Sequence, residues 1–455
     1  MTARIEYAPG HLPTFWDESV VFFANLMALF YGNEGATQEL ENKVGGIHTY
    51  GGRLCPLLNL LFTGPHNLLV LEAAPDETLL EYFRDVGLDL PEVAILRHER
   101  YRMLRDELRS VRDSKDHDAR AIDRIAESRA PWIDGFVTDQ VLADVAEMLD
   151  KSTVISPEVS RRGNNKLLLH QFLQGQGLPT FDTEIATGPG DVSEAAARLR
   201  TQGYRQAVVK AQIGATGIGM LKIDTDAPQL DRVQAHMFYE GPCLVQGWLD
   251  EAFSGVSHIG SPSMQIFLDD STCWMYDVTE QILSGQSVHE GNLSPPWYWR
   301  SQPEIEPQMR EQVTAVAQWL YQIGYRGTAS ADFVVVRRSG RIEVRLCEVN
   351  ARVTGATYPS VLARRFCPGG FWLMRNLFFD PPIRGGELLD ALRRVGHLYT
   401  GQPQGGLFPI NFNTDQAGLT RKAQFLCFAA DADRCLNCLI QAADVLPVKW
   451  AYDRD

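Results

Sequence analysis

One stretch constrains the fold of this chain more than any other. Residues 330–354 read SADFVVVRRSGRIEVRLCEVNARVT. Alternating apolar side chains predict two strands, at 332–336 and 341–350, because strand residues alternate between the two faces of a sheet. The residues between them, 338–340, read RSG, which suits a three-residue hairpin loop with glycine in the left-handed conformation. The stretch therefore predicts an antiparallel hairpin.

This hairpin is predicted to have a face that is apolar along its length and acidic at one end. In the expected register Asp332 faces Leu346 and lies diagonal to Glu348, close enough to share an ion. Two carboxylates and the amide of Asn350 form an oxygen-only ligand set that suits Mg²⁺ carrying phosphates. Arg352 continues the alternation and is expected to point toward the same region. The alternative interpretation is a surface hairpin with ordinary charges. The residues expected on this face are Asp332, Val334, Val336, Ile342, Val344, Leu346, Glu348 and Asn350.

A glycine-rich loop follows the strand predicted at 207–210. It reads QIGATGIG over 212–219, and a second strand is expected at 220–223. The loop lacks the Lys-Ser/Thr pair of a Walker motif, and it precedes a strand, which rules out a Rossmann fingerprint. We expect it to fold over phosphates as a flap that donates backbone N–H groups, with Lys210 supplying a positive charge. An ordinary hairpin turn is the alternative.

Two neighbouring segments fit a nucleotide site of this kind. A helix is predicted at 166–174, after two asparagines and before two glycines. A strand at 242–249 ends in a linker, where backbone groups and the amide of Gln246 could contact the edge of an adenine ring. Both segments flank the glycine-rich loop in sequence.

Two loops have open interpretations. Trp297, Tyr298 and Trp299 lie in a loop flanked by proline, which is either a packed connection or a wall of a groove for an extended peptide amine. Further upstream, pairs of glycines flank two basic side chains and could form an anion-binding loop, although no strand–helix context supports it. These residues are Gly45, Gly46, His48, Gly51, Gly52 and Arg53.

The N-terminal part is predicted to be an α/β unit over residues 1–155. Strands are expected at 67–72 and 93–96, with a helix at 75–84 between them. Residues 97–129 are dense in alternating charges and are expected to form a solvated helical excursion, with an arm for homodimerisation as the alternative.

Length and charge limit the class of protein. A chain of 455 residues suggests about two or three domains. The 43 basic and 57 acidic residues give a formal charge of −14, which argues against nucleic-acid and membrane partners. The eight cysteines have no disulfide-framework spacing, and the apolar run at 20–30 is too short to span a bilayer. A reducing cytoplasm is the expected location.

Taken in order, these features resemble the ATP-grasp carboxylate–amine ligases. The resemblance covers about residues 155–365 and rests on Lys166, Lys210, the glycine-rich loop, the 246–249 linker, Gln281 and the GYRG, ADF and CEVNARVTG runs. The SPSMQ run at 261–265 and the segment 405–446 are most similar to the peptide ligase of pheganomycin biosynthesis and its relatives. The resemblance implies an α/β (α+β) ATP-grasp fold. Its implied parts are a pre-ATP-grasp α/β domain (1–155), an ATP-grasp domain with the nucleotide and metal site (156–370) and a small C-terminal α+β region (371–455).

The resemblance also implies roles for individual residues. Arg352 would face the reacting carboxylate, and either Asp250 or Glu251 would bind the ribose. Many family members have Glu-Lys where this chain has Gln246-Gly247. One or two Mg²⁺ ions would be bound by Asp332, Glu348 and Asn350. ATP would be contacted by Lys166, Lys210, Gly214, Thr216, Gly217, Gly219, Gln246, Trp248, Leu249 and Gln281.

The implied reaction joins a small carboxylic acid to an amine or peptide. The γ-phosphoryl of ATP would pass to the acid, and the amine would then attack the acylphosphate, releasing ADP and phosphate. We expect an amino-acid-like acid and a peptide or amino-acid amine, in the biosynthesis of a peptide natural product. A catalytically silent nucleotide-binding regulatory module, and a kinase or thioester ligase with a non-amine acceptor, are the alternatives.

Overall fold

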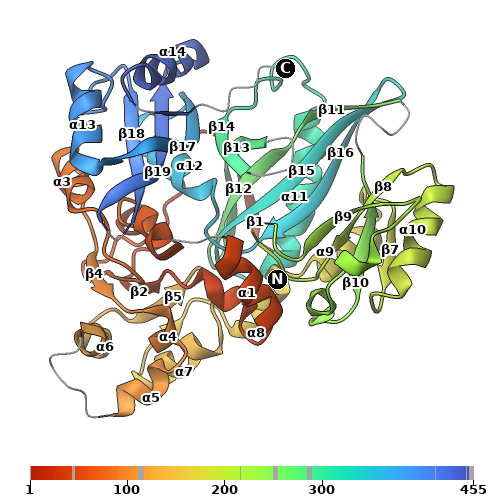
Figure 1. Cartoon of the computed structure of the whole chain (residues 1–455), viewed down its shortest axis with the longest axis horizontal. Helices are drawn as coiled ribbons and strands as arrows, with labels where there is room; N and C mark the ends of the chain where they lie inside the picture. The colour runs from red at the N-terminus through yellow and green to blue at the C-terminus, as the bar shows by residue number, and fades with distance from the viewer. Residues whose placement is uncertain are drawn as a thin grey trace.

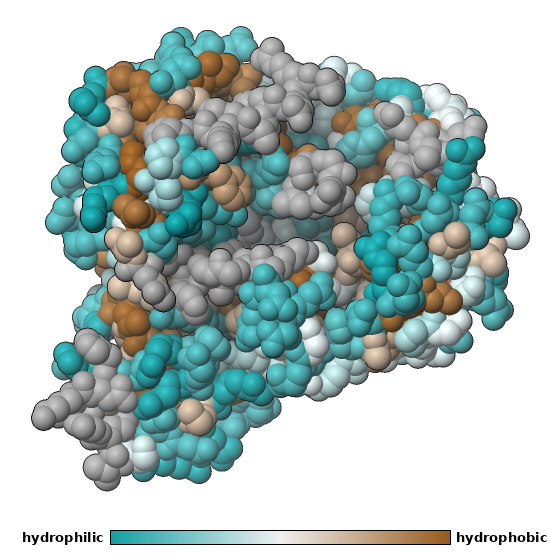
Figure 2. All heavy atoms as spheres, in the orientation of Figure 1, coloured by the Kyte–Doolittle hydropathy of each residue, from teal (hydrophilic) through white to brown (hydrophobic). Residues whose placement is uncertain are grey.

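The computed structural model describes residues 2–43, 47–110, 117–215, 217–249, 255–283, 289–415, 417–446 and 448–449. Within these ranges the strands form three sheets, and helices pack around each of them (Figure 1). Figure 2 shows the same side in space-filling form, hollowed near its middle between the part built from β17–β19 and the part built from β7–β10.

The N-terminal sheet is parallel, with strand order β4-β3-β2-β5-β6. Its central strands are buried along their whole length, as their continuous apolar runs predict. The expected strands at 67–72 and 93–96 and the helix between them are confirmed. The elements are β2 (Val20–Phe23), η1 (Leu26–Phe30), α1 (Glu34–Lys43), η2 (Ile47–Leu54), α2 (Leu58–Leu61), β3 (Leu68–Leu71), α3 (Glu77–Asp85), β4 (Glu92–Ile95), α4 (His98–Tyr101), α5 (Leu104–Arg109), α6 (His117–Glu127), β5 (Trp132–Gly135), α7 (Gln140–Met148), β6 (Ser152–Thr153) and α8 (Pro157–Gly163).

A small antiparallel sheet carries the glycine-rich loop. Its strand order is β7-β10-β8-β9, and the loop joins β8 to β9. The predicted helices and strands of this region are all present. They are α9 (Lys166–Gly175), β7 (Thr183–Ala186), α10 (Asp191–Thr201), β8 (Gln206–Lys210), β9 (Met220–Asp224), η3 (Leu230–Arg232), η4 (Ala235–Phe238) and β10 (Cys243–Gly247).

The third sheet has eleven strands among the described residues and extends to the C-terminal region. Its main path is β11-β15-β12-β13-β14-β17-β19-β18, with β1, β16 and β20 attached at its sides. The elements are β1 (Arg4–Tyr7), β11 (Val256–Gly260), β12 (Pro262–Leu268), β13 (Thr272–Leu283), β14 (His289–Ser294), α11 (Ile305–Gln322), β15 (Gly327–Arg338), β16 (Arg341–Asn350), α12 (Thr357–Phe366), β17 (Phe371–Arg384), α13 (Gly385–Arg394), β18 (Gly406–Thr414), β19 (Leu419–Ala429), α14 (Ala432–Ala443) and β20 (Val448–Lys449).

This sheet crosses the expected domain boundaries. The N-terminal strand β1 pairs in parallel with β13, so residues 4–7 join the large sheet and not the N-terminal one. Strand β14 pairs with β17, so the sheet also continues across the boundary expected at residue 370. The division into three units therefore stays a prediction, and the sheet shows how closely the second and third units are joined.

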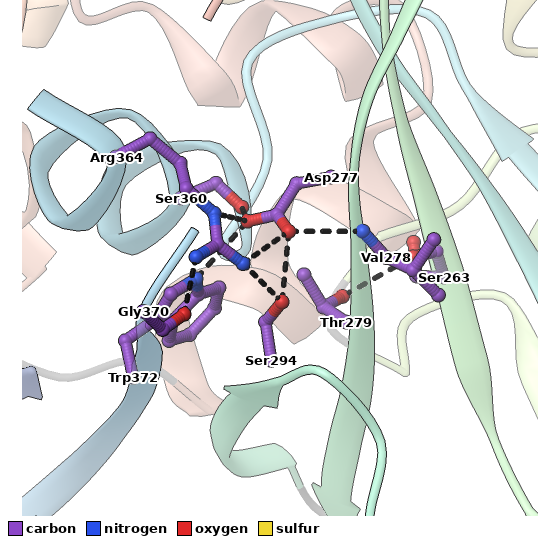
Figure 3. Close-up of polar contacts among 9 residues, drawn as sticks. All are labelled: Ser263, Asp277, Val278, Thr279, Ser294, Ser360, Arg364, Gly370 and Trp372. Atoms are coloured by element: carbon purple, nitrogen blue, oxygen red, sulfur yellow. Dashed lines mark hydrogen bonds and ion pairs between the residues drawn. The ribbon is translucent and has the colours of Figure 1, made fainter. Parts of the chain in front are cut away.

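A buried polar network lies at this junction (Figure 3). Asp277 on β13 and Arg364 on α12 form an ion pair of 2.7 Å, with side chains only 1% and 3% exposed. Ser360 also donates to the Asp277 carboxylate at 2.7 Å, and Trp372 Nε1 donates from β17 at 3.0 Å. Arg364 also donates to the backbone carbonyl of Gly370. The network thus connects strands and a helix on both sides of residue 370.

The loop of the β15–β16 hairpin is shorter than expected. Arg338 pairs with Arg341, so only Ser339 and Gly340 lie between the strands. Both have positive φ, 49° and 79°, as a two-residue type I′ turn requires. The predicted hairpin is confirmed, and its predicted three-residue loop is wrong.

A β-bulge also changes the register of this hairpin. Asp332 pairs directly with Glu348, and Phe333 pairs with Leu346, so Cys347 is the extra residue on β16. A bulge reverses which face the following residues reach. The predicted single face is therefore wrong for three residues, which pack in the core beside α11. These are Ile342, Val344 and Leu346.

Candidate active site

The acidic end of the hairpin brings the predicted metal ligands together. Ser263 Oγ on β12 donates to Asp332 Oδ1 at 2.6 Å, and Asn350 Nδ2 donates to Asp332 Oδ2 at 2.9 Å. Burial, and then the nearby charge of Glu348, raise the pKa of Asp332 to about 6. The two carboxylates are opposed across the strand pair, an arrangement that a cation would stabilise.

Glu348 is also bound by a lysine from the start of α9. Lys166 Nζ lies 2.8 Å from Glu348 Oε1. Burial alone would raise the pKa of Glu348, but the charge and hydrogen bond of Lys166, together with the charges of Arg352 and Lys210, outweigh it and hold this pKa below its ordinary value. Glu348 is therefore ionised at neutral pH and available as a ligand.

The donor set at this site fits Mg²⁺. Two carboxylates and an amide provide the oxygen ligands that Mg²⁺ prefers, and Mg²⁺ commonly keeps several waters and phosphate oxygens as its other ligands. Among the described residues no group of three or more His, Cys, Asp or Glu side chains could hold a metal. A site closed by protein ligands, as in structural zinc centres, is thus not present in that part of the chain.

A pocket next to these carboxylates contains three of the predicted ATP-binding residues, Lys166, Lys210 and Gln246. Burial, countered by Cys347 and Glu348 and reinforced by Lys166, lowers the pKa of Lys210. Gln246 is 5% exposed, and its Nε2 donates to Thr183 Oγ1 at 3.1 Å. In the described structure the buried Gln246 Oε1 has no hydrogen-bond partner.

The glycine-rich loop lies over the start of α9. A Cβ on Gly214 would come within 2.5 Å of the Ile218 carbonyl oxygen, and Gly217 and Gly219 have φ of 79° and 72°. These three positions therefore require glycine. Ile218 is buried against residues of η1 and α1, so the loop contacts the N-terminal unit. The contacting residues are Met27, Phe30, Ala36 and Leu40. Thr216, a predicted ATP contact, lies outside the described residues.

Arg352 lies at the end of the same hairpin, where it is held by α8. Its Nη1 donates to Asn164 Oδ1, and Asn164 Nδ2 donates back to the Ala351 carbonyl at 3.2 Å. The positive charge of Arg352 lowers the pKa values of both Asp332 and Glu348, although less than other groups do. The structure thus places Arg352 with the carboxylates, while its catalytic role remains a prediction.

The other predicted ATP contacts do not all lie at this pocket. Trp248 and Leu249 follow β10, and Lys222 Nζ lies 4.4 Å from the centre of the Trp248 ring. Gln281 lies on β13 opposite Asn292, in the large sheet. It does not line the pocket that contains Lys166 and Gln246. The candidate ribose ligands, Asp250 and Glu251, lie outside the described residues.

The aromatic loop divides into packed and exposed residues. Tyr298 donates to Glu280 Oε2 at 2.5 Å, and both Tyr298 and Trp299 pack against the core of the large sheet. Trp297 is 52% exposed and lies 4.9 Å from the Phe371 ring. The packed-connection alternative therefore describes two of the three residues, and a substrate contact by Trp297 stays a prediction.

Several residues of the site were missed by the sequence reasoning. Ser263 donates to Asp332 at 2.6 Å, Gln265 Nε2 donates to Ser263 Oγ at 2.9 Å, and both residues belong to the SPSMQ run. Gln212 accepts from the backbone of Lys166 through its carbonyl and from Asn165 through its side chain, at 2.9 and 2.8 Å. The pocket is also lined by His170, Thr180 and Phe181. The SPSMQ run carried a sequence signal for Ser263 and Gln265, and Gln212 begins the glycine-rich loop, but no signal marked His170, Thr180 or Phe181 as pocket residues.

With this geometry, the chain has the ATP-grasp fold, and its likeness to solved structures confirms the predicted fold class. Staphylococcus aureus N5-carboxyaminoimidazole synthetase, solved with ADP, is 11% identical with a TM-score of 0.54, covering 95% of this chain and 99% of that one. Campylobacter jejuni biotin carboxylase, solved with an ATP analogue, is 13% identical with a TM-score of 0.55, covering 95% and 92%. At these identities the likeness concerns the fold alone.

The chain is similar in sequence to known ligases. The chain is 24% identical over 305 residues to the butirosin acyl-carrier protein–L-glutamate ligase of Niallia circulans, covering 66% of this chain. It is 25% identical over 338 residues to the L-propargylglycine–L-glutamate ligase of Streptantibioticus cattleyicolor, covering 67% of this chain. The matches span 64% and 66% of these relatives. The resemblance to ATP-grasp carboxylate–amine ligases is thereby confirmed, and no family model matches the chain.

One further property follows from the helices. None of those in the described ranges combines the length and the apolar character needed to cross a bilayer.

Proposed function

We propose that this protein is an ATP-dependent carboxylate–amine ligase. It joins an amino-acid-like acid to the amine of an amino acid or peptide, as a step in the biosynthesis of a peptide natural product. The reaction passes through an acylphosphate and releases ADP and phosphate. ATP and Mg²⁺ are its cofactors.

One contact carries this proposal. Lys166 lines the pocket that contains Lys210 and Gln246, and its Nζ also bonds Glu348 at 2.8 Å. One side chain thus belongs both to this pocket and to the oxygen ligands for a metal. A nucleotide with its base at Gln246 and its phosphates near Glu348 would contact both the pocket and the metal ligands. The unpaired Gln246 Oε1 is an acceptor for the exocyclic amine of adenine.

The chemistry requires two anions to meet. Lys166, Lys210 and Arg352 supply positive charge where a carboxylate oxygen attacks the γ-phosphorus of ATP and ADP leaves. Bound Mg²⁺, held by Asp332, Glu348 and Asn350, would add the charge of a Lewis acid on the phosphate oxygens.

The second step forms the C–N bond. The uncharged amine attacks the acyl carbon, and the tetrahedral oxyanion collapses. The acyl C–O bond breaks, phosphate leaves with the bridging oxygen, and the proton of the amine passes to solvent. Arg352 offers a planar, two-pronged donor to this oxyanion. Because water would also attack an acylphosphate, a closed glycine-rich loop protects it.

The relatives suggest the substrates. Both are named as ligases of L-glutamate, one with L-propargylglycine and one with an acyl-carrier protein. Glutamate is therefore the first acid and the first amine to test. Because one relative's name includes a carrier protein, an acceptor tethered to a carrier protein is the second candidate.

The proposal is tested by ADP release with a panel of amino acids as donors and hydroxylamine as amine. Hydroxylamine converts an acylphosphate into a hydroxamate without the natural acceptor. We expect ADP and hydroxamate in equal amounts with at least one acid, and loss of both in Glu348→Gln. ATP binding without acid-dependent turnover would instead support a silent nucleotide-binding module.

A further inference from the structure

A second group of basic side chains lies away from the nucleotide pocket. We define the cationic cluster as Arg53 on η2, His289 on β14 and Lys422 on β19. None of the three lines the pocket that contains Lys166 and Lys210. The three residues come from segments far apart in sequence, and the fold brings them together.

The cluster is built into the protein. Arg53 is 6% exposed, and its guanidinium stacks on the Tyr358 ring of α12, 5.0 Å from the ring centre. Lys422 Nζ lies 5.3 Å from the centre of the Phe378 ring, directly across the β17–β19 strand pair. Such aromatic contacts hold a cation in place.

The cations also act on one another. Burial and then the charge of Arg53 lower the pKa of Lys422. Burial, followed by the charges of Arg53, Lys422 and Arg375, lowers the pKa of His289, against a hydrogen bond of 2.7 Å with Asn292, so this imidazole is neutral at pH 7 and contributes hydrogen bonding to the cluster. Arg375 lies on the opposite face of β17 from Asn376 and is paired with Glu290 at 3.2 Å. Like charges held together cost free energy, which an anionic ligand would offset.

Amides surround the cluster on the same face of the sheet. Asn376 and Gln424 pair across β17 and β19, and their side chains are joined by a bond of 3.0 Å. Asn411 of β18 lies opposite Gln424 and approaches η2, since a Cβ on Gly52 would come within 2.4 Å of its Oδ1. Amides beside cations suit a ligand that carries a carboxylate together with neutral polar groups.

The cluster lies close to the predicted reaction centre. A Cβ on Gly355 would lie 3.7 Å from His289 Cε1. Gly355 is three residues after Arg352, so their Cα atoms are separated by about 11 Å at most. An amino acid bound at the cluster could therefore extend its amine toward Arg352.

We propose that the cationic cluster binds the carboxylate of an amino-acid acceptor and so presents its amine to the acylphosphate. This inference rests on the ligase function proposed above. An amino-acid acceptor carries a carboxylate that must not itself be phosphorylated. Cations separate from Lys166, Lys210 and Arg352 bind it without placing it beside the γ-phosphate.

The test compares two amines in one enzyme. Hydroxylamine has no carboxylate that the cluster could bind, whereas L-glutamate has two. In Lys422→Met, which keeps the apolar stem against Phe378, we expect the KM for L-glutamate as acceptor to rise about 10- to 100-fold, because a charged hydrogen bond contributes roughly 1.5–3 kcal/mol. The hydroxylamine reaction and the KM for ATP should change less than twofold. Glutamate dimethyl ester, which keeps the amine but lacks both carboxylates, should react equally in both proteins.

A matched control removes a neighbouring charge. Arg421 precedes Lys422 on β19, is 68% exposed and pairs with Asp415 at 3.3 Å. Because successive strand residues point to opposite faces, Arg421→Gln should leave the KM for L-glutamate unchanged. Arg53→Gln is the second cluster variant if Lys422→Met does not fold.

Each other outcome overturns the inference. Equal loss of the hydroxylamine and L-glutamate reactions would assign the cluster to the donor acid or to phosphate. Unchanged kinetics in both cluster variants would make it structural. If the wild type forms no hydroxamate with any acid, the ligase function itself fails. Calorimetric titration of L-glutamate into wild type and Lys422→Met then decides the cluster alone, and equal affinity refutes it.

Discussion

The buried ion pair between Asp277 and Arg364 gives the sharpest prediction of stability. Asp277→Asn keeps the shape of the side chain and removes its charge, which leaves the Arg364 guanidinium 3% exposed without its counter-ion. Breaking a buried pair by removing one partner costs about 3–5 kcal/mol. In a unit of this size each kcal/mol lowers Tm by about 2–4 °C, so we expect a loss of about 6–20 °C.

The assay is urea and thermal unfolding followed by tryptophan fluorescence, to which Trp372 contributes from within the network. The control is Asp390→Asn, which breaks an exposed pair with Arg393 of nearly the same length, 2.8 Å. Exposed pairs contribute about 0–1 kcal/mol. A loss in Asp277→Asn no larger than that of the control would refute the reasoning.

The same experiment tests the expected boundary at residue 370. The network and the β14–β17 pairing both cross it. We therefore expect residues 255–283 and 289–446 to unfold in a single transition. A separate transition for residues 371–446 would show that the C-terminal region is an independent unit.

Four further predictions concern the site and its surroundings. Glu348→Gln should lower turnover by at least about 100-fold at saturating Mg²⁺ with the fold intact, because it removes one charged ligand; an unchanged rate would make the hairpin purely structural. Arg352→Lys should bind ATP nearly normally and lose about 10²–10³ in single-turnover ligation, since charge is kept and the planar fork is lost; weakened ATP binding with intact chemistry would contradict this. Burial raises the pKa of Asp134 to about 7. Its unfolded pKa is near 3.9, so the stabilising proton is fully present below about pH 4 and lost as pH rises through about 7. Asp134→Asn, which cannot lose that proton, should be more stable than wild type at pH 8 by at most about 4 kcal/mol and equal to it near pH 4, and a difference independent of pH in urea unfolding would refute this. Trp297→Ala should raise the KM for a peptide amine and leave that for ATP unchanged, while equal effects on both would favour a packed loop.

Local patterns were enough to predict most of the elements. The helix at 166–174 and the strands at 207–210 and 220–223 follow from apolar periodicity and glycine positions, and the structure has them within a residue or two. The acidic end of the hairpin was also predicted. Two strands joined by a short loop must pair with each other, and this pairing brings Asp332 close to Glu348.

Long-range pairing could not be predicted in the same way. The bulge at Cys347 has no local signature, since it depends on how β12, β15 and α11 pack together. The cationic cluster joins residues 53, 289 and 422, and nothing in the sequence relates them before the sheet forms. Ser263 and Gln265 were visible only as part of a resemblance, because Ser263 contacts Asp332 across strands and Gln265 acts through Ser263.

The burial of Ile218 among Met27, Phe30, Ala36 and Leu40 has a consequence for engineering. A hybrid enzyme that grafts this nucleotide-binding region onto the N-terminal region of another ligase would keep Lys166, Lys210 and every carboxylate. It would nevertheless lose the apolar residues of η1 and α1 against which Ile218 of the glycine-rich loop packs. A functional graft must therefore carry residues 26–40 along with the region that binds the nucleotide.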